Sequence, residues 1–430
     1  MNSTVRRIVR NFFSLNIVQI ASYVFPLIAL PYIVRVIGPE KYGAINFAQA
    51  IIVYFTLVVL YSFDYTATRE ISAHRDDHAF VSRLFYTVIA TRLLIFIILA
   101  VPLFLLLQIP KFHQQHWLYI ILYFMNLGIA LYPQFFFQGI EELQRVAVFN
   151  FIIKFVFTVS VFVLLRTEDD YLFVPVSTTL GYCVVGIISF IYAIRRYSLS
   201  FVRIPFREIR SLIKNSFKIF ISSITTNLYT TTNTVLIGFF VGDTAVGYFS
   251  AAEKLVSVIQ NVTLNPMFQT LFPFLGKTLY DNRPKGIEYL EKVFLWIFVI
   301  SFLLSVGVVL FAPLLVRILF GQKFAPTVPV LYFLAWLLFL RGISGICGIQ
   351  GMVNLKMDRE FLHITIVGMV LCFIFNLILL SHFAEVGSAA AWILTEIYIS
   401  ISTFHQLKKN GIFSFTRSKI KSILTKLPYV

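Results

Sequence analysis

Long apolar runs of about 20 residues alternate with short polar segments along the whole chain. A helix of that length crosses the roughly 30 Å of hydrocarbon in a bilayer. A lipid-exposed strand could not satisfy its backbone there, and the runs lack the alternation of a membrane barrel, so we expect helices. Twelve spans are predicted, at about residues 12–36, 44–66, 82–107, 117–139, 147–165, 171–194, 216–241, 244–275, 289–312, 327–352, 361–381 and 387–407.

The two halves of the chain repeat each other in short stretches. Residues 241–255, VGDTAVGYFSAAEKL, align with residues 37–51, IGPEKYGAINFAQAI, at a shift of 204 positions. Residues 138–140, QGI, align with residues 350–352, QGM, at a shift of 212. Internal repeats indicate duplicated structural units. We therefore predict an N-terminal lobe at 1–205, a C-terminal lobe at 206–410, each with six spans, and a basic cytoplasmic tail at 411–430.

Composition agrees with an all-α polytopic membrane protein. The chain is 58% apolar and 17% aromatic, with a mean hydropathy of +0.83, far from the composition of soluble domains. Its net charge of +16 does not indicate nucleic acid, because the basic residues lie between the apolar runs. Seven of them fall in residues 195–218, which we interpret as a cytoplasmic linker. The positive-inside rule then places both termini in the cytoplasm.

Polar residues recur on one face of four predicted helices, the first two of each half. Such stripes must line a hydrated cavity or hold a dry helix interface together. Their recurrence in both halves favours the cavity, with Gln19, Gln49 and Asn227 as candidate substrate contacts. The stripes, at helical spacing, are Asn16, Gln19 and Tyr23; Asn46 and Gln49; Ser223, Asn227, Thr230 and Thr234; and Ser250, Glu253, Ser257 and Gln260.

Charged residues inside the spans are further candidates, because a charge at mid-bilayer is costly. Glu253 and Lys254 lie near the middle of the eighth span, Arg92 lies in the third and Arg341 in the tenth. Arg69 lies near the inner end of the second span. Positive residues outnumber negative ones within the spans, which would suit an anionic cargo. The alternative is that these charges form buried pairs that fix helix packing.

Motifs of soluble enzymes are absent from the sequence. There is no Walker A, HExxH or GxSxG sequence, and the three cysteines show no metal-ligand spacing. No predicted loop is large enough for a catalytic domain. We therefore expect a protein that is not an enzyme and that uses no cofactor and no metal.

Several segments are similar to one known family. LPYIVRVIGPEKYGAINFAQA and TATREI, between residues 16 and 71, resemble the bacterial polysaccharide exporters, the Wzx-type flippases of O-antigen and other lipid-linked oligosaccharides. VGYFSAAEKL, QKFAPTVPVL and LRGISGICGIQGM extend the resemblance over nearly the whole chain. This family shares a superfamily with the multidrug exporters and the lipid II flippases. The resemblance implies a MATE-like fold of two pseudo-symmetric six-helix lobes around a central cleft.

The resemblance also implies a function in lipopolysaccharide or related polysaccharide biosynthesis. The cargo would be an undecaprenyl-pyrophosphate-linked oligosaccharide, moved by alternating access from the inner to the outer leaflet of the bacterial inner membrane. By motif position, Arg69 and Lys254 would hold the pyrophosphate, assisted by Arg92 and Arg341. The expected partners are this lipid-linked glycan, membrane lipids, a polysaccharide polymerase and a chain-length regulator, with no nucleic acid.

Two other functions remain open at this point. A cation-coupled multidrug antiporter of the same superfamily would use Glu253 as its ion-coupling residue. A membrane-embedded enzyme of polysaccharide assembly is the second, although polymerases of this kind usually carry one large outer loop, which is absent here. Lipid II is a less favoured cargo, because its flippases carry an arginine-rich first helix, whereas the polar stripe of the first span here offers Asn16 and Gln19.

Overall fold

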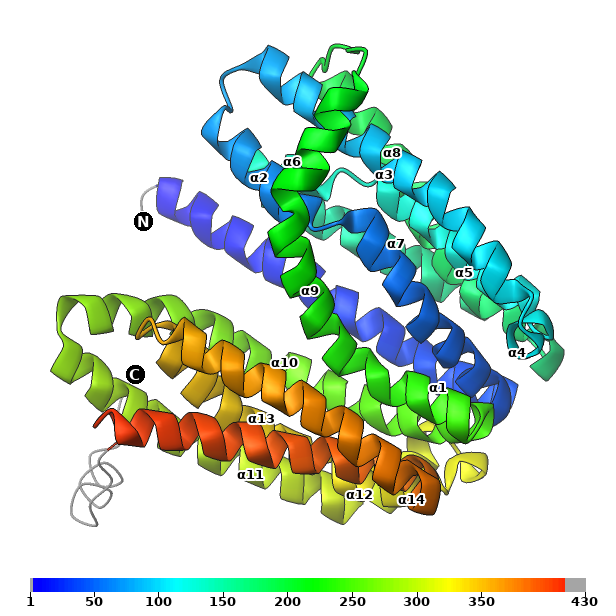
Figure 1. The fold of residues 1–430 in the computed structure, drawn as a ribbon, viewed down its shortest axis with the longest axis vertical. Helices are drawn as coiled ribbons and strands as arrows, with labels where there is room; N and C mark the ends of the chain where they lie inside the picture. Colours follow the sequence, from blue (N-terminus) through cyan, green and yellow to red (C-terminus); the bar gives the residue numbers. More distant parts are fainter. Residues whose placement is uncertain (1–2, 414–430) are drawn as a thin grey trace. The chain divides into compact units, whose positions relative to one another are not determined.

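The computed structural model describes residues 3–413, except for the side chains of residues 3–24, 26, 27, 222 and 225–230. Within this range the chain is helical and contains no strand. Contacts divide the chain into two compact units, unit 1 at Met1–Thr231 and unit 2 at Thr232–Val430. The predicted all-α polytopic fold is confirmed, and Figure 1 shows the order of the helices.

Unit 1 contains the first nine α-helices, the last of which continues into unit 2. Buried aromatic side chains from α2, α3 and α6, including Phe63, Phe85 and Phe136, form its core. The elements are α1 (Ser3–Leu60), α2 (Phe63–Ala73), α3 (His78–Leu107), α4 (Pro110–His113), α5 (His116–Leu131), α6 (Gln134–Gly139), α7 (Leu143–Leu164), η1 (Glu168–Leu172), α8 (Phe173–Arg196) and α9 (Phe206–Phe240).

Two glycines set the distance between α5 and α8 in unit 1. A Cβ atom on Gly186 would overlap the carbonyl oxygen of Gly128, and one on Gly128 would overlap the backbone of Tyr182. Membrane helices associate closely where small residues face each other, because no hydrophobic effect drives them together in lipid. The close backbone contact at Gly128 and Gly186 therefore requires glycine at both positions and favours the pairing of α5 with α8.

Unit 2 contains the end of α9 and the remaining helices. A nine-residue π-helix, η3, forms the end of the tenth predicted span. The long helix α14 contains the last two predicted spans and has a break at Ala384. The elements are α10 (Asp243–Asp281), α11 (Arg283–Leu319), η2 (Gln322–Phe324), α12 (Thr327–Leu334), α13 (Trp336–Ser344), η3 (Gly345–Val353) and α14 (Asp358–Lys409).

Glycines at twin positions of the two halves share an unusual backbone conformation. Gly38 breaks α1 with φ 71° and ψ 176°, and Gly242 precedes α10 with φ 127° and ψ 178°. Only glycine populates this region readily, because a Cβ atom clashes there. The shared conformation explains why both halves keep a glycine at this point, and it supports the predicted duplication.

A second pair of matched irregularities lies in the fourth and tenth spans. In unit 1 the span breaks at Pro133, and Gln138-Gly139 follows in the short helix α6. In unit 2 the corresponding Gln350-Gly351 lies in the π-helix η3. Irregular helix at the same place in both halves agrees with the 212-residue shift found in the sequence.

Eight helices of the described part are long and apolar enough to cross a membrane. They include Asp358–Lys409, which contains the last two predicted spans, and Ile28–Ala73, which contains the second predicted span and the end of the first. One helix of the predicted polar stripes, α10, is fully described and is not among the eight. Polar residues lower its hydropathy, as expected of a helix that faces protein or water rather than lipid.

The units differ in extent from the predicted lobes. Residues 206–231 of α9 group with unit 1 by their contacts, whereas the sequence repeat assigns them to the second lobe. The contacts of α9 with α2 and α3, described below, are the physical reason. The division into lobes at residue 205, and the central cleft between them, stay predictions.

Candidate functional site

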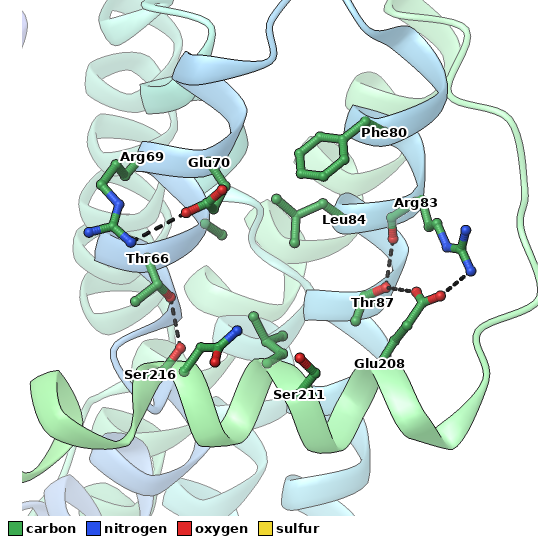
Figure 2. Close-up of a pocket in the computed structure, with 13 residues that line it drawn as sticks. Thr66, Arg69, Glu70, Phe80, Arg83, Leu84, Thr87, Glu208, Ser211 and Ser216 are labelled. Carbon is green, nitrogen blue, oxygen red and sulfur yellow. Dashed lines mark hydrogen bonds and ion pairs between the residues drawn. The ribbon is translucent and has the colours of Figure 1, made fainter.

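A polar pocket of about 500 Å³ opens in unit 1 between α2, α3 and the first turns of α9. This volume lies within the range of about 300–1,000 Å³ that is typical of small-molecule sites. Figure 2 shows Arg69 and Glu70 on one side, Phe80, Arg83 and Thr87 on the other, and α9 running beneath them. The pocket is lined by Thr66, Ala67, Arg69, Glu70, Phe80, Arg83, Leu84, Thr87, Glu208, Ser211, Leu212, Asn215 and Ser216.

Polar contacts fix α9 at both ends of this pocket. At one end Glu208 forms an ion pair with Arg83 and accepts a hydrogen bond of 3.3 Å from the Thr87 hydroxyl. At the other end the Thr66 and Ser216 hydroxyls lie 2.9 Å apart. Figure 2 shows both sets of contacts. Ser211 and Asn215 lie between the two fixed points and line the pocket.

Further contacts continue along the same face of α9. The Phe220 ring stacks on Tyr61 with 4.0 Å between the ring centroids, and Ser62 donates a hydrogen bond of 2.9 Å to Ser223. Tyr61 and Ser62 both have positive φ, at 45° and 57°, where the chain turns from α1 into α2. Such backbone persists only where the surroundings hold it. Ser223, from the polar stripe of the seventh predicted span, therefore lies in a helix contact, which was the alternative to a cavity.

Arg69 lies at the edge of the pocket with its side chain 74% exposed. Its guanidinium contacts the neighbouring Glu70 at 3.3 Å. An exposed ion pair of this kind contributes about 0–1 kcal/mol, so the side chain can change partners at little cost. The structure thus places a predicted substrate contact at the mouth of a pocket.

Arg92, in contrast, is fully buried in unit 1. Its guanidinium donates a hydrogen bond of 2.8 Å to Asp64 and one of 3.3 Å to the carbonyl oxygen of Tyr132, and it lies 5.2 Å from the ring centroid of Phe135. These contacts join α2, α3 and the start of α6. The geometry matches the alternative stated for in-span charges, a buried pair that fixes packing.

Arg341 lies in a second polar cluster, within unit 2. Its guanidinium donates hydrogen bonds of 2.9 Å to Gln260 and 3.4 Å to Glu396, and it lies 4.8 Å from the ring centroid of Trp392. The arginine therefore connects α13 to α10 and α14. Glu253 of α10 is in electrostatic range of both Arg341 and Lys254.

The surplus of positive charge inside the spans is smaller than the sequence suggests. Arg92 is paired with Asp64, and Arg341 is paired with Glu396. Lys254 lies on α10 with an exposed side chain, whereas Arg92 is fully buried and Arg341 half-buried. Lys254 lies roughly 17 Å along α10 from Asp243, at about 1.5 Å of rise per residue.

The polar stripes of the second and eighth spans stand out from their surroundings. Gln49 and Glu253, at twin positions, are half-buried, whereas their neighbours Ala48, Ala50 and Ala252 are buried. This pattern gives each stripe an accessible polar edge within a packed helix. Gln19 and Asn227 belong to the side chains outside the described part, and the tail at 414–430 lies outside it too.

A neutral polar network holds the end of α9 within unit 2. Asn376 donates a hydrogen bond of 2.8 Å to Asn233 and accepts one of 2.6 Å from Ser388. All three side chains are fully buried. Interhelical hydrogen bonds of this kind stabilise helix contacts in membranes, so this part of α9 is a dry interface.

An exposed ion pair lies at the end of unit 1 that the sequence predicts to be cytoplasmic. Arg75, just after α2, forms a 2.8 Å contact with Glu141 and donates a hydrogen bond to the carbonyl oxygen of Gly139. The hydrogen bond and the positive charge of Arg75 lower the pKa of the Glu141 carboxyl below its ordinary value.

Sequence reasoning missed residues of the unit 1 pocket and the partner of Arg92. Arg83 and Glu208 line the pocket, and Asp64 neutralises Arg92, yet none was a candidate contact. One signal was present for Glu208, which is the single acidic residue within the basic segment 195–218. Asp64 also carried a signal, because it is a charge near the inner end of the second predicted span, but its partner lies 28 positions away on another helix.

Comparison with known proteins adds a family and a fold. The model of a family described as "Polysaccharide biosynthesis protein" matches residues 8–279. The chain is 29% identical over 401 residues to a protein of Escherichia coli (strain K12) named "Putative O-antigen transporter", which covers 93% of this chain and 96% of that one.

Two solved structures share the fold over nearly the whole chain. One is the lipid II flippase MurJ in an inward closed conformation, with a TM-score of 0.73, 13% identity and coverage of 97% of this chain and 94% of that one. The other is an inward-facing multidrug resistance MATE family transporter, with a TM-score of 0.69, 16% identity and coverage of 94% and 96%. The predicted MATE-like fold of about twelve membrane helices is confirmed, and the chain is a multi-pass membrane protein.

Proposed function

This chain belongs to the polysaccharide biosynthesis protein family, as predicted from its motifs, and we propose that it is a flippase for a lipid-linked oligosaccharide. The cargo would be an undecaprenyl-pyrophosphate-linked repeat unit, such as that of O-antigen, carried from the inner to the outer leaflet of the bacterial inner membrane. The observation that carries this proposal is the end-to-end similarity to the Escherichia coli protein named as an O-antigen transporter.

Both units contribute features that suit a cargo with an anionic head and an apolar tail. Arg69 offers an exposed guanidinium at the pocket of unit 1, and Lys254 offers an exposed ammonium on α10. Arginine and lysine bind phosphate by charge-assisted hydrogen bonds. We assign the pyrophosphate to these two residues in turn, as the chain passes between inward-facing and outward-facing states.

Arg92, which is fully buried, and Arg341, which is half-buried, take a different role in this proposal. Arg92 and Arg341 each contact a carboxylate and further groups on neighbouring helices. A guanidinium so engaged holds helices in place and would contact cargo only after giving up these bonds. We therefore treat Arg92 and Arg341 as positioning residues, whereas Gln19, Gln49 and Asn227 remain candidate contacts with the glycan.

The drug antiporter has less support from the comparisons, because the similar Escherichia coli protein is named as an O-antigen transporter. The ion-coupling residue of the antiporter would be Glu253, which lies in electrostatic range of Arg341 and Lys254. Loss of such an antiporter would change sensitivity to toxic cations, whereas loss of the flippase would remove a surface glycan.

Substitution of Lys254 tests the proposal in cells. In a strain that lacks the native gene, a copy with Lys254→Ala should fail to restore surface polysaccharide while its level in the membrane stays normal. Lys277→Ala is the matched control, because Lys277 is also an exposed lysine of α10 but lies near the end of that helix. A Lys254→Ala copy that restores the full amount of polysaccharide would contradict the role of Lys254.

Other parts of the proposal follow from the family. Both termini would lie in the cytoplasm, and a polysaccharide polymerase and a chain-length regulator would act on the cargo after it crosses. No step of this transport requires a covalent bond to be made or broken, so the protein would act as a transporter and not as an enzyme.

A further inference from the structure

The charges of the unit 1 pocket balance, which sets the kind of ligand that the pocket can hold. Its walls include two arginines, Arg69 and Arg83, and two glutamates, Glu70 and Glu208. Each arginine contacts one of these carboxylates. A phosphate group deep in the pocket would meet both carboxylates, and like charges at such distances repel. The pocket interior is therefore a poor site for an isolated anion.

The polar groups that line the pocket can instead both donate and accept hydrogen bonds. Serine and threonine hydroxyls do both, the Asn215 amide offers two donors and an acceptor oxygen, and Glu208 accepts. A sugar ring carries several hydroxyl groups that also donate and accept. Among neutral ligands, a polyhydroxylated one makes the fullest use of such walls.

Phe80 adds an apolar surface to the same pocket. Its half-buried ring packs against the His74 ring on one side, with 4.4 Å between the ring centroids, and lies beside Leu84 on the wall formed by α3 (Figure 2). The face of an aromatic ring is electron-rich and attracts the slightly positive C–H groups of another molecule. A pyranose ring presents such C–H groups on one face and hydroxyl groups around its edge, so it matches a pocket with one aromatic wall and polar walls elsewhere.

The pocket is also rigid enough to select a ligand. Its floor, the segment of α9 from Glu208 to Ser216, is fixed at both ends by the contacts with Arg83, Thr87 and Thr66. A site that is formed before the ligand arrives avoids the cost of ordering side chains on binding. Ser211 and Asn215 lie on this fixed segment and line the cavity.

From these observations we infer that the unit 1 pocket binds a sugar ring of the cargo, the one next to the pyrophosphate, while Arg69 at its mouth contacts the pyrophosphate. This inference rests on the proposed function and adds a glycan subsite to it. In this arrangement the pocket recognises the first sugar, and Arg69 binds only the pyrophosphate.

Equilibrium binding to the purified full-length chain in lipid nanodiscs tests the inference. The probes are undecaprenyl pyrophosphate and undecaprenyl-pyrophosphoryl-N-acetylglucosamine, which differ by one sugar, and native mass spectrometry gives both dissociation constants. The wild type should bind the sugar-bearing lipid more tightly. The double variant Ser211→Ala and Asn215→Ala should lose about tenfold in affinity for that lipid, since each neutral hydrogen bond contributes roughly a factor of two to ten.

Controls separate the subsite from general damage. Ser211 and Asn215 are exposed, so the double variant should unfold at the wild-type temperature. Lys214→Gln changes an exposed residue on the same helix that does not line the pocket, and it should leave the sugar preference intact. Phe80→Leu keeps an apolar side chain but removes the ring, and it should weaken only the sugar-bearing lipid. Arg69→Ala should weaken both lipids.

The possible failures are distinguishable. Equal affinity of the wild type for the two lipids, or a double variant that keeps the sugar preference, would overturn the inference and leave the proposed function standing. A double variant that loses phosphatidylethanolamine from the nanodisc, and keeps the sugar-bearing lipid, would assign the pocket to a phospholipid headgroup. Absence of binding of either undecaprenyl lipid would overturn the proposed function itself.

Discussion

Removal of Asp64 should destabilise the protein far more than removal of a surface carboxylate, because it leaves Arg92 buried without its partner. The guanidinium of Arg92 has no exposed surface, and Asp64 is 24% exposed. At the 2.8 Å separation of the two groups, an effective dielectric constant of about 20 gives an attraction of about 6 kcal/mol. After desolvation is included, loss of one partner of a buried pair costs about 3–5 kcal/mol.

The assay compares the unfolding free energies of a set of variants in bicelles. Asp64→Ala should lose about 3–5 kcal/mol, and the double variant Asp64→Leu with Arg92→Met should regain most of that loss, because two apolar side chains need no partner. Glu142→Ala breaks the exposed pair with Arg145 and serves as the matched control, with an expected loss of at most about 1 kcal/mol.

The same variants decide whether Arg92 touches the cargo. If Arg92 is a positioning residue, the double variant recovers transport together with stability. A double variant that is as stable as the wild type but does not transport would assign Arg92 to the cargo. A double variant no more stable than Asp64→Ala would refute the reasoning about the buried pair.

Two further predictions follow from contacts of unit 1. Gly186→Ala should lower the melting temperature, because its new methyl group would overlap the backbone of Gly128 and separate α5 from α8; an unchanged melting temperature would contradict that packing. Glu141→Gln should lower the melting temperature slightly near neutral pH, since the carboxylate with its lowered pKa is stabilised by Arg75. The difference from wild type should vanish as pH falls through the lowered pKa of Glu141, below about 4.3, and a difference that persists in acid would exclude this ion pair as its cause.

Periodicity within single helices was enough to predict much of the fold. The apolar runs marked the membrane helices, and the aligned glycines at 38 and 242 marked two breaks that the structure confirms with positive φ. The polar stripe of the eighth span also identified α10 as less apolar than the helices that qualify as membrane spans. These features depend on residues close together in the chain, and their spacing can be read directly.

Contacts between helices could not be predicted in the same way. Arg341 meets Gln260 across 81 positions, and Thr66 meets Ser216 across 150. A helical pattern shows which face of a helix is polar but not which helix that face contacts. The pocket of unit 1, and the pairing of Arg92 with Asp64, therefore emerged only from the structure. The sequence also gave no reason to expect a π-helix at residues 345–353.

Movement of a lipid-linked glycan across a bilayer is the central claim, and reconstitution tests it most directly. Purified full-length protein is placed in liposomes that carry a fluorescent undecaprenyl-pyrophosphate-linked oligosaccharide, and a glycosidase outside the vesicles digests only the outer leaflet. The account predicts that digestion proceeds well beyond the outer half with wild-type protein and stops near one half without protein. Digestion that stops near one half in both preparations would contradict it.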